Sequence, residues 1–253
     1  MQGIRIKTKN YIFKPALIPS LITIALLYLM ISLGLWQIDR AEYKANLQSI
    51  IESKKNTQAI PLNLIKNTAT EENQNEWLYQ PVYIEGSYDL SHQIYFDNQI
   101  NNTVAGYSVY TPLKLSSNTA ILINRGWVPL GINRINLPDI SINNSNKSIK
   151  LTGLLTPPPS KTLVLSDNAN SYLKWPAVLQ YIDITEIEKH LDYQLLPVTI
   201  IMNNQSQTSL EILPVKINMR SEKHTAYAFQ WFALSLALLI IYIVVNTKRT
   251  VKN

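Results

Sequence analysis

Two uncharged apolar stretches decide how this chain can fold: PALIPSLITIALLYLMISLGLWQI at residues 15–38 and TAYAFQWFALSLALLIIYIVVNT at residues 225–247. A helix needs roughly 20 apolar residues to cross a bilayer core about 30 Å thick. Both stretches are long enough, so they predict transmembrane helices, assigned to 15–36 and 225–246. One folded region is then held between two membrane anchors.

Charge is distributed unequally between the ends and the middle of the chain. The net charge is +6, yet residues 1–36 and 248–253 hold seven basic side chains and no acid, which leaves the middle close to neutral. Short basic segments beside a span stay on the cytoplasmic side. The tails 1–14 and 247–253 are therefore expected in the cytoplasm, and residues 37–224 on the periplasmic side. A near-neutral folded region also argues against nucleic-acid binding.

Several kinds of catalytic site are excluded or poorly supported by composition. Cysteine is absent, which rules out a disulfide, a thiolate metal site and a cysteine nucleophile. The chain has three histidines at no zinc-binding spacing, and His92 and His190 are expected to be solvated. The sequence has no glycine-rich phosphate loop and no serine in a nucleophile elbow. The sequence therefore predicts a protein that is not an enzyme.

The region between the spans is predicted to be mostly β-sheet. A helix over 37–58 continues the first span, and a short helix over 184–191 begins at Asp183 or Thr185. Strand-like segments rich in Val, Ile, Tyr and Thr recur between Gly, Asn or Pro clusters. They are 81–89, 93–98, 107–115, 120–127, 149–155 and 196–203. Segments 137–147 and 156–170 are expected to be loops.

This pattern indicates the fold class. Short strands at such spacing favour an antiparallel sheet that is closed or partly closed as a small barrel. The prediction is a membrane α+β protein in which two transmembrane helices bracket one mostly antiparallel, barrel-like domain on the trans side of the membrane.

The outer ends of the two spans carry the side chains best suited to hold a ligand. LGLWQIDRAEYK (33–44) ends the first span, and RSEKHTAYAFQWFALS (220–235) begins the second. His224, Tyr227 and Trp231 are spaced three and four apart, so they lie on one helix face. An imidazole is a natural axial ligand for a haem iron, and flat aromatic rings beside it would stack on a porphyrin.

Two interpretations of these span ends stay open. In the first, Trp36 adds another ring against a bound tetrapyrrole, while Arg40 and Lys223 pair with its propionates. In the second, the aromatic rings form an ordinary interfacial belt. Gln37 and Gln230 would then serve as hydrogen-bonding contacts between the helices.

Four segments resemble the Surfeit locus protein 1 family, in the family's order along the chain. They are LGLWQIDRAEYK (33–44), GYSVYTPL (106–113), ILINRGWVP (121–129) and HTAYAFQWFALS (224–235). The resemblance implies the family's two spans around one trans-side domain, and a role in assembling haem–copper cytochrome c oxidase. The chain departs from the family where Trp, Asn and an apolar residue are more usual, at Tyr43, Lys223 and Thr225.

The resemblance also implies a cofactor and partners. In that family the histidine at the start of the second span is the proposed contact for haem a, which here is His224, and the haem would be held transiently during its insertion into oxidase subunit I. Further implied partners are haem a synthase and other assembly factors, in the inner membrane of a bacterium. The alternative function is a cofactor-free membrane scaffold that bridges subunit I and other assembly proteins.

The second signature of the family lies inside the predicted domain. With the glutamines of the spans, the residues carried over are Gln37, Asn124, Arg125, Gly126, Trp127 and Gln230. One interpretation gives Arg125, Gly126 and Trp127 a functional role. The other is structural, since a glycine turn with an arginine–acid pair and a packed tryptophan would have the same sequence.

Overall fold

The computed structural model describes residues 6–7, 11–68, 74–131, 136–142, 148–159, 174–203, 208–213, 215 and 220–249. The chain divides into two compact units. One unit comprises residues 1–49 with 217–253, and the other comprises residues 50–216.

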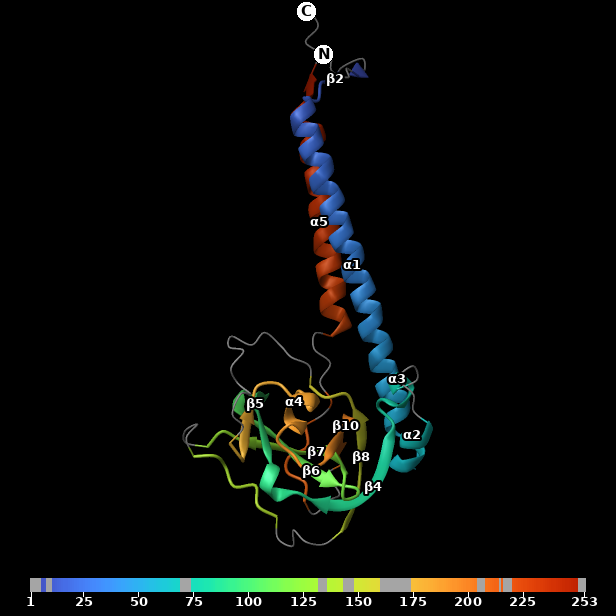
Figure 1. The fold of residues 1–253 in the computed structure, drawn as a ribbon. Coiled ribbons are helices and arrows are strands. Elements are labelled where there is room, and N and C mark those ends of the chain that lie inside the picture. Colours follow the sequence, from blue (N-terminus) through green and yellow to red (C-terminus); the bar gives the residue numbers. More distant parts are fainter. Residues whose placement is uncertain are drawn as a thin grey trace, which may run out of the picture. The chain divides into compact units, whose positions relative to one another are not determined.

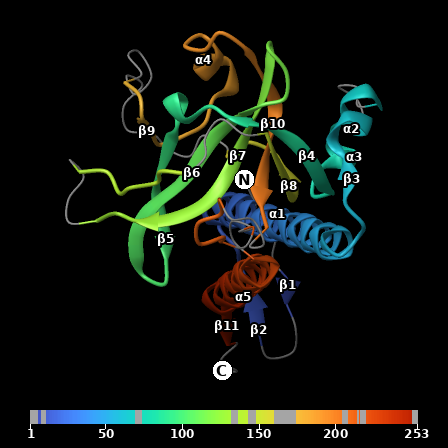
Figure 2. The same ribbon diagram turned by 90° about the horizontal axis from the view of Figure 1, so that it is seen from below.

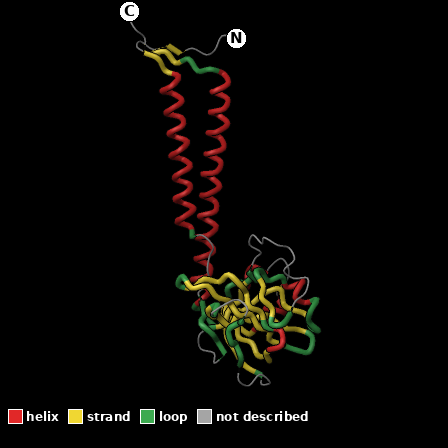
Figure 3. Tube along the Cα trace, turned by 90° about the vertical axis from the view of Figure 1, so that its left-hand side faces the viewer, coloured by secondary structure: helices red, strands yellow, loops and turns green. Residues whose placement is uncertain are grey.

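The first unit is built on two long helices that run side by side and antiparallel, α1 (Leu17–Lys55) and α5 (Ser221–Asn246) (Figures 1 and 3). Both contain stretches long and apolar enough to cross a membrane, so the two predicted long apolar helices are confirmed. The predicted continuation of the first span is also present, since α1 runs without a break to Lys55. The Ser20 hydroxyl lies 2.5 Å from the Tyr242 hydroxyl and joins the two helices near one end.

A small sheet at the same end of the helix pair was not predicted. It contains β1 (Ile6–Lys7), β2 (Tyr11–Phe13) and β11 (Thr247–Arg249), all antiparallel. The strands are too short to have a sequence pattern, and they pair because the two helices bring residues 11–13 and 247–249 together. The hydrogen bond from the Lys14 amide to the Asn246 carbonyl, at 2.9 Å, continues this register into the helices.

The second unit is a closed five-stranded barrel, whose strands can be followed in Figure 2. The order around it is β4 (Pro81–Tyr88), β8 (Ile149–Thr156), β10 (Gln194–Met202), β7 (Thr119–Pro129) and β6 (Val104–Lys114). Pairing of β4 with β6 closes the ring. Only the β7–β10 pair of this ring is parallel, so the predicted barrel-like, mostly antiparallel domain is confirmed.

Shorter elements extend and cover the barrel. They are β3 (Ile60–Pro61) beside β4, β5 (Ile94–Asn101) beside β6, β9 (Ala177–Leu179) beside β5, α2 (Leu62–Thr68), α3 (Gln74–Trp77), α4 (Ile184–Glu188) and the 3-10 turn η1 (Leu90–His92). The predicted helix cap is Asp183, whose carboxylate accepts from the amides of Thr185 and Glu186. Residues 137–142 and 157–159 are irregular as expected, whereas Thr156 is the last residue of β8. Residues 143–147 and 160–170 of the two predicted loops lie outside the described residues.

Strand β7 separates two hydrophobic cores. Its side chains alternate between faces, so Ile121 and Ile123 lie in the core that includes the barrel residues of β4, β8 and β10. Ala120 and Leu122 lie in a second core that includes Ile187 of α4. Each fully buried large aliphatic side chain stabilises the fold by about 1.5–3 kcal/mol. The alternation therefore gives both faces of β7 a buried partner.

Candidate functional site

His224 is held between the two long helices. It begins the second turn of α5, is 7% exposed, and its Nδ1 lies 2.7 Å from the Oε1 of Gln37 on α1. An amide oxygen only accepts hydrogen bonds, so this contact is a hydrogen bond when Nδ1 carries the proton. The neutral ring then has its lone pair on Nε2, which is the arrangement seen in histidines that ligate metals.

The two helices also pack closely about one turn of α1 away from Gln37, which stabilises the contact with His224. Gly34 of α1 is buried, and a Cβ added there would lie 2.7 Å from the Phe232 ring of α5. Glycine therefore allows the two backbones to approach, as small residues do in membrane helix pairs. The face of α5 that is buried carries His224, Ala228 and Ser235.

The other predicted ligand-holding side chains lie on the same two helices and are more accessible than His224. Trp36 is 48% exposed, and the Arg40 guanidinium lies 5.5 Å from its ring centroid, a cation–π contact within α1. Tyr227 is 46% exposed and Trp231 is partly buried, while Gln230 is exposed. Tyr227 lies about 60° around the helix from His224, so it is not part of the buried contact.

The arginine of the second signature lies in the barrel domain and is buried, with 2% exposure. The register of β7 against β6 skips Arg125, so it is the extra residue of a β-bulge. Its guanidinium donates to the Thr208 carbonyl, the Ile140 carbonyl and the Gln93 amide oxygen at 3.0–3.1 Å. Burial lowers the pKa of Arg125, but a guanidinium stays protonated in proteins. These three described acceptors are uncharged oxygens. The structural interpretation of the signature had instead predicted that the arginine pairs with an acidic side chain.

The neighbours of Arg125 bind the segment that precedes α5 in the chain. The Trp127 amide donates to the Glu211 carbonyl at 2.7 Å, and the Leu210 amide donates to the Arg125 carbonyl at 2.6 Å. Gly126 has φ +121°, which side chains other than glycine rarely adopt, and it packs against Glu211. The signature therefore binds residues 208–211 to the barrel.

A polar cluster that sequence reasoning missed surrounds the buried Asp89. Its Oδ2 accepts from Tyr193 at 2.8 Å, lies 2.9 Å from the Nδ1 of His92, and lies 3.2 Å from the Lys114 ammonium. Burial raises the pKa of Asp89, but hydrogen bonds from these three groups outweigh it and hold that pKa below its ordinary value.

The expectation for one domain histidine is therefore wrong. His92 is paired with Asp89, and its ring packs edge-on against Trp175 at 4.8 Å. The spacing of three between Asp89 and His92 was the available signal, because residues three apart meet across a helical turn. His190 is exposed, as expected.

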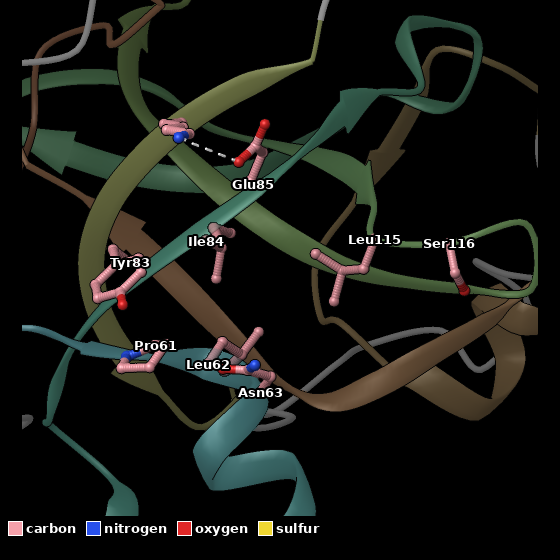
Figure 4. A pocket seen from close by; sticks show the side chains of 9 residues that line it. Pro61, Leu62, Asn63, Tyr83, Ile84, Glu85, Leu115 and Ser116 are labelled. Atoms are coloured by element: carbon pink, nitrogen blue, oxygen red, sulfur yellow. Dashed lines mark ion pairs between the residues drawn. The ribbon is translucent and has the colours of Figure 1, made fainter.

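A cleft of about 540 Å³ lies beside β4 in the described part of the domain (Figure 4). Its floor is apolar, and its one acid and one base, Glu85 and Lys150, pair with each other at 3.5 Å. The other lining residues are Pro61, Leu62, Asn63, Tyr83, Ile84, Leu115 and Ser116.

The described part of the chain has no cluster of side chains that would form a second metal site. No group of three or more His, Cys, Asp or Glu side chains there could hold a metal ion. A single imidazole is still sufficient for a haem, because the porphyrin supplies four ligands to the iron itself. His224 with its Gln37 partner is thus the candidate functional site.

The fold and this site define an integral membrane protein, in which two span helices bracket a small β-barrel domain and a buried histidine lies at the helix contact. The chain belongs to the SURF1 family, whose sequence pattern matches residues 24–236. The match includes most of α1, the barrel domain and the first part of α5.

Relatives are similar over much of the chain. A SURF1-like protein of Rickettsia felis is 27% identical over 238 residues, covering 89% of this chain and 95% of that protein. Surfeit locus protein 1 of Rattus norvegicus is 22% identical over 233 residues, covering 86% and 72%. Cytochrome oxidase assembly protein SHY1 of Saccharomyces cerevisiae is 26% identical over 133 residues, covering 51% and 33%.

Proposed function

We propose that this chain is an assembly factor for haem–copper cytochrome c oxidase, and that it binds haem a through His224 and assists its insertion into subunit I. Membership of the SURF1 family and the similarity to the yeast cytochrome oxidase assembly protein SHY1 support the assembly role. The observation that carries the haem role is the contact of 2.7 Å between His224 Nδ1 and Gln37 Oε1. It leaves the other ring nitrogen able to bind iron.

The side chains around His224 fit an amphipathic tetrapyrrole. Trp36 and Tyr227 expose flat rings for stacking, and Arg40 exposes a cation suited to a propionate. When bound, haem a supplies the iron and the macrocycle, and the chain binds and orients it without turnover. The protein acts as a chaperone in this proposal, with no enzymatic step.

The membrane setting follows from the basic tails. Both termini lie in the cytoplasm of a bacterium, and the barrel domain lies in the periplasm, where the outer ends of the spans meet incoming haem. Subunit I is the recipient, and haem a synthase is the candidate donor. Other assembly factors of the oxidase complete the set of proposed partners.

Purification of the full-length protein from cells that make haem a tests this function. The wild type is expected to show a Soret band that is lost in His224→Ala. His190→Ala is the matched control, since it removes an exposed imidazole from the domain. Equal haem in wild type and His224→Ala, or none in either, would show that the ligand assignment is wrong.

A cofactor-free scaffold is the second candidate, and one observation favours it. The same His224–Gln37 hydrogen bond lies between the helices, so it stabilises their pairing whether or not haem is present. A scaffold predicts normal haem a content of the oxidase in cells carrying His224→Ala. The chaperone predicts oxidase that lacks haem a but keeps its copper supply.

A further inference from the structure

Gln37 determines which nitrogen of His224 is free. The side chain is partly buried on α1, and its amide oxygen is the acceptor within 2.7 Å of the imidazole Nδ1. A neutral imidazole in water favours the tautomer with the proton on Nε2. In that tautomer Nε2 has no lone pair in the ring plane with which to bind a metal. An acceptor fixed beside Nδ1 reverses this preference, because only the Nδ1–H form makes the hydrogen bond.

We infer that Gln37 is a positioning residue that holds His224 as the Nδ1–H tautomer and so presents Nε2 as the iron ligand. This inference rests on the proposed haem role of His224. Gln37 does not touch the iron in this account. It acts through the imidazole, as the hydrogen-bonding partners of metal-bound histidines do in general, and loss of such a partner lowers metal affinity 10- to 100-fold.

A purely structural role for Gln37 makes a different prediction. In that case the hydrogen bond only joins α1 to α5, and its loss is equivalent to the loss of any other bond between them. The chain offers such a bond at the far end of the helix pair, between Ser20 and Tyr242. Tyr242→Phe removes it without touching His224, so this variant separates helix pairing from tautomer control.

The decisive measurement uses the apo full-length protein in detergent. Histidine is labelled with ¹⁵N, and long-range ¹⁵N–¹H spectra are recorded at a pH where the imidazoles are neutral. The chain has three histidines, and the His224 signals are identified by their loss in His224→Ala. Titration with ferric haem a then gives the affinity of each variant.

The wild type is expected to show His224 with its proton on Nδ1. Gln37→Leu is expected to move the proton to Nε2 and to weaken haem a binding 10- to 100-fold. Gln37→Glu keeps an acceptor and should keep the wild-type tautomer. Gln48→Leu, which changes an exposed glutamine of the same helix, and Tyr242→Phe should leave both readouts unchanged.

Three results would overturn the inference. They are a wild-type proton on Nε2, an unchanged tautomer in Gln37→Leu, or the same shift in Tyr242→Phe as in Gln37→Leu. Failure of the proposed function is seen separately, as a wild type with the expected tautomer that binds no haem a. Conversely, the wild type could bind haem a through His224 while the spectra show the His224 proton on Nε2. That result would support the proposed function and contradict the positioning role of Gln37.

Discussion

Replacing Gly126 by alanine tests how the second signature supports the domain. Gly126 has φ +121°, and a Cβ there would lie 2.8 Å from the Glu211 carbonyl oxygen. Since that atom belongs to the backbone, residues 210–211 must move away. The movement breaks the bonds from the Trp127 amide to Glu211 and from the Leu210 amide to Arg125.

The expected cost combines two effects. A non-glycine residue in this backbone conformation costs about 1–3 kcal/mol, and each lost backbone hydrogen bond costs about 1 kcal/mol. Gly126→Ala should therefore lower the free energy of unfolding by about 3–5 kcal/mol. Gly131→Ala is the matched control. Gly131 also has a positive φ, +74°, but its added Cβ would lie 3.9 Å from the nearest atom, Asn136 O, so only about 1–2 kcal/mol is expected.

Urea unfolding of the full-length protein gives both free energies, and amide hydrogen exchange reports the local effect. Faster exchange at Leu210 and Trp127 in Gly126→Ala, with no change in Gly131→Ala, is the expected pattern. If Gly126→Ala costs no more than Gly131→Ala, or if the Leu210 amide stays protected, the signature does not hold this segment to β7.

Three further predictions concern the helix pair, the buried carboxylate and the topology. Gly34→Val should separate α1 from α5, because the added side chain meets the Phe232 ring, and an unchanged distance between spin labels on the two helices would contradict this. Asp89 has a lowered folded pKa, so its stabilisation is present above the unfolded pKa of about 4 and is lost as pH falls through the folded pKa. Asp89→Asn should lower the free energy of unfolding by about 2–4 kcal/mol at neutral pH. Urea unfolding should show that the difference in this free energy between the variant and the wild type becomes smaller below about pH 4. A difference that does not change with pH would refute the ionic role of Asp89. In this cysteine-free chain, a membrane-impermeant maleimide should label Ser117→Cys in intact cells and Lys248→Cys only after lysis, and the reverse pattern would invert the topology.

Local patterns in the sequence determined the elements of this protein. The two apolar stretches were long enough to require span helices, and β-branched and aromatic runs marked the six main strands, because burial and backbone preference act over a few neighbouring residues. The cap at Asp183 was predictable for the same reason. The interfacial histidine was also visible in the sequence, as an ionisable group at the start of an apolar helix.

Only the tertiary structure decided which of these residues meet. Four contacts join residues far apart in the chain: the closing pair β4–β6, the parallel pair β7–β10, the hydrogen bond from Tyr193 to Asp89, and the pairing of Gln37 with His224. Such contacts depend on how elements pack and on which buried polar groups must find partners, and no local pattern encodes either. The sequence thus identifies His224 as a candidate ligand, whereas the packing of α1 on α5 determines which of its nitrogens is free.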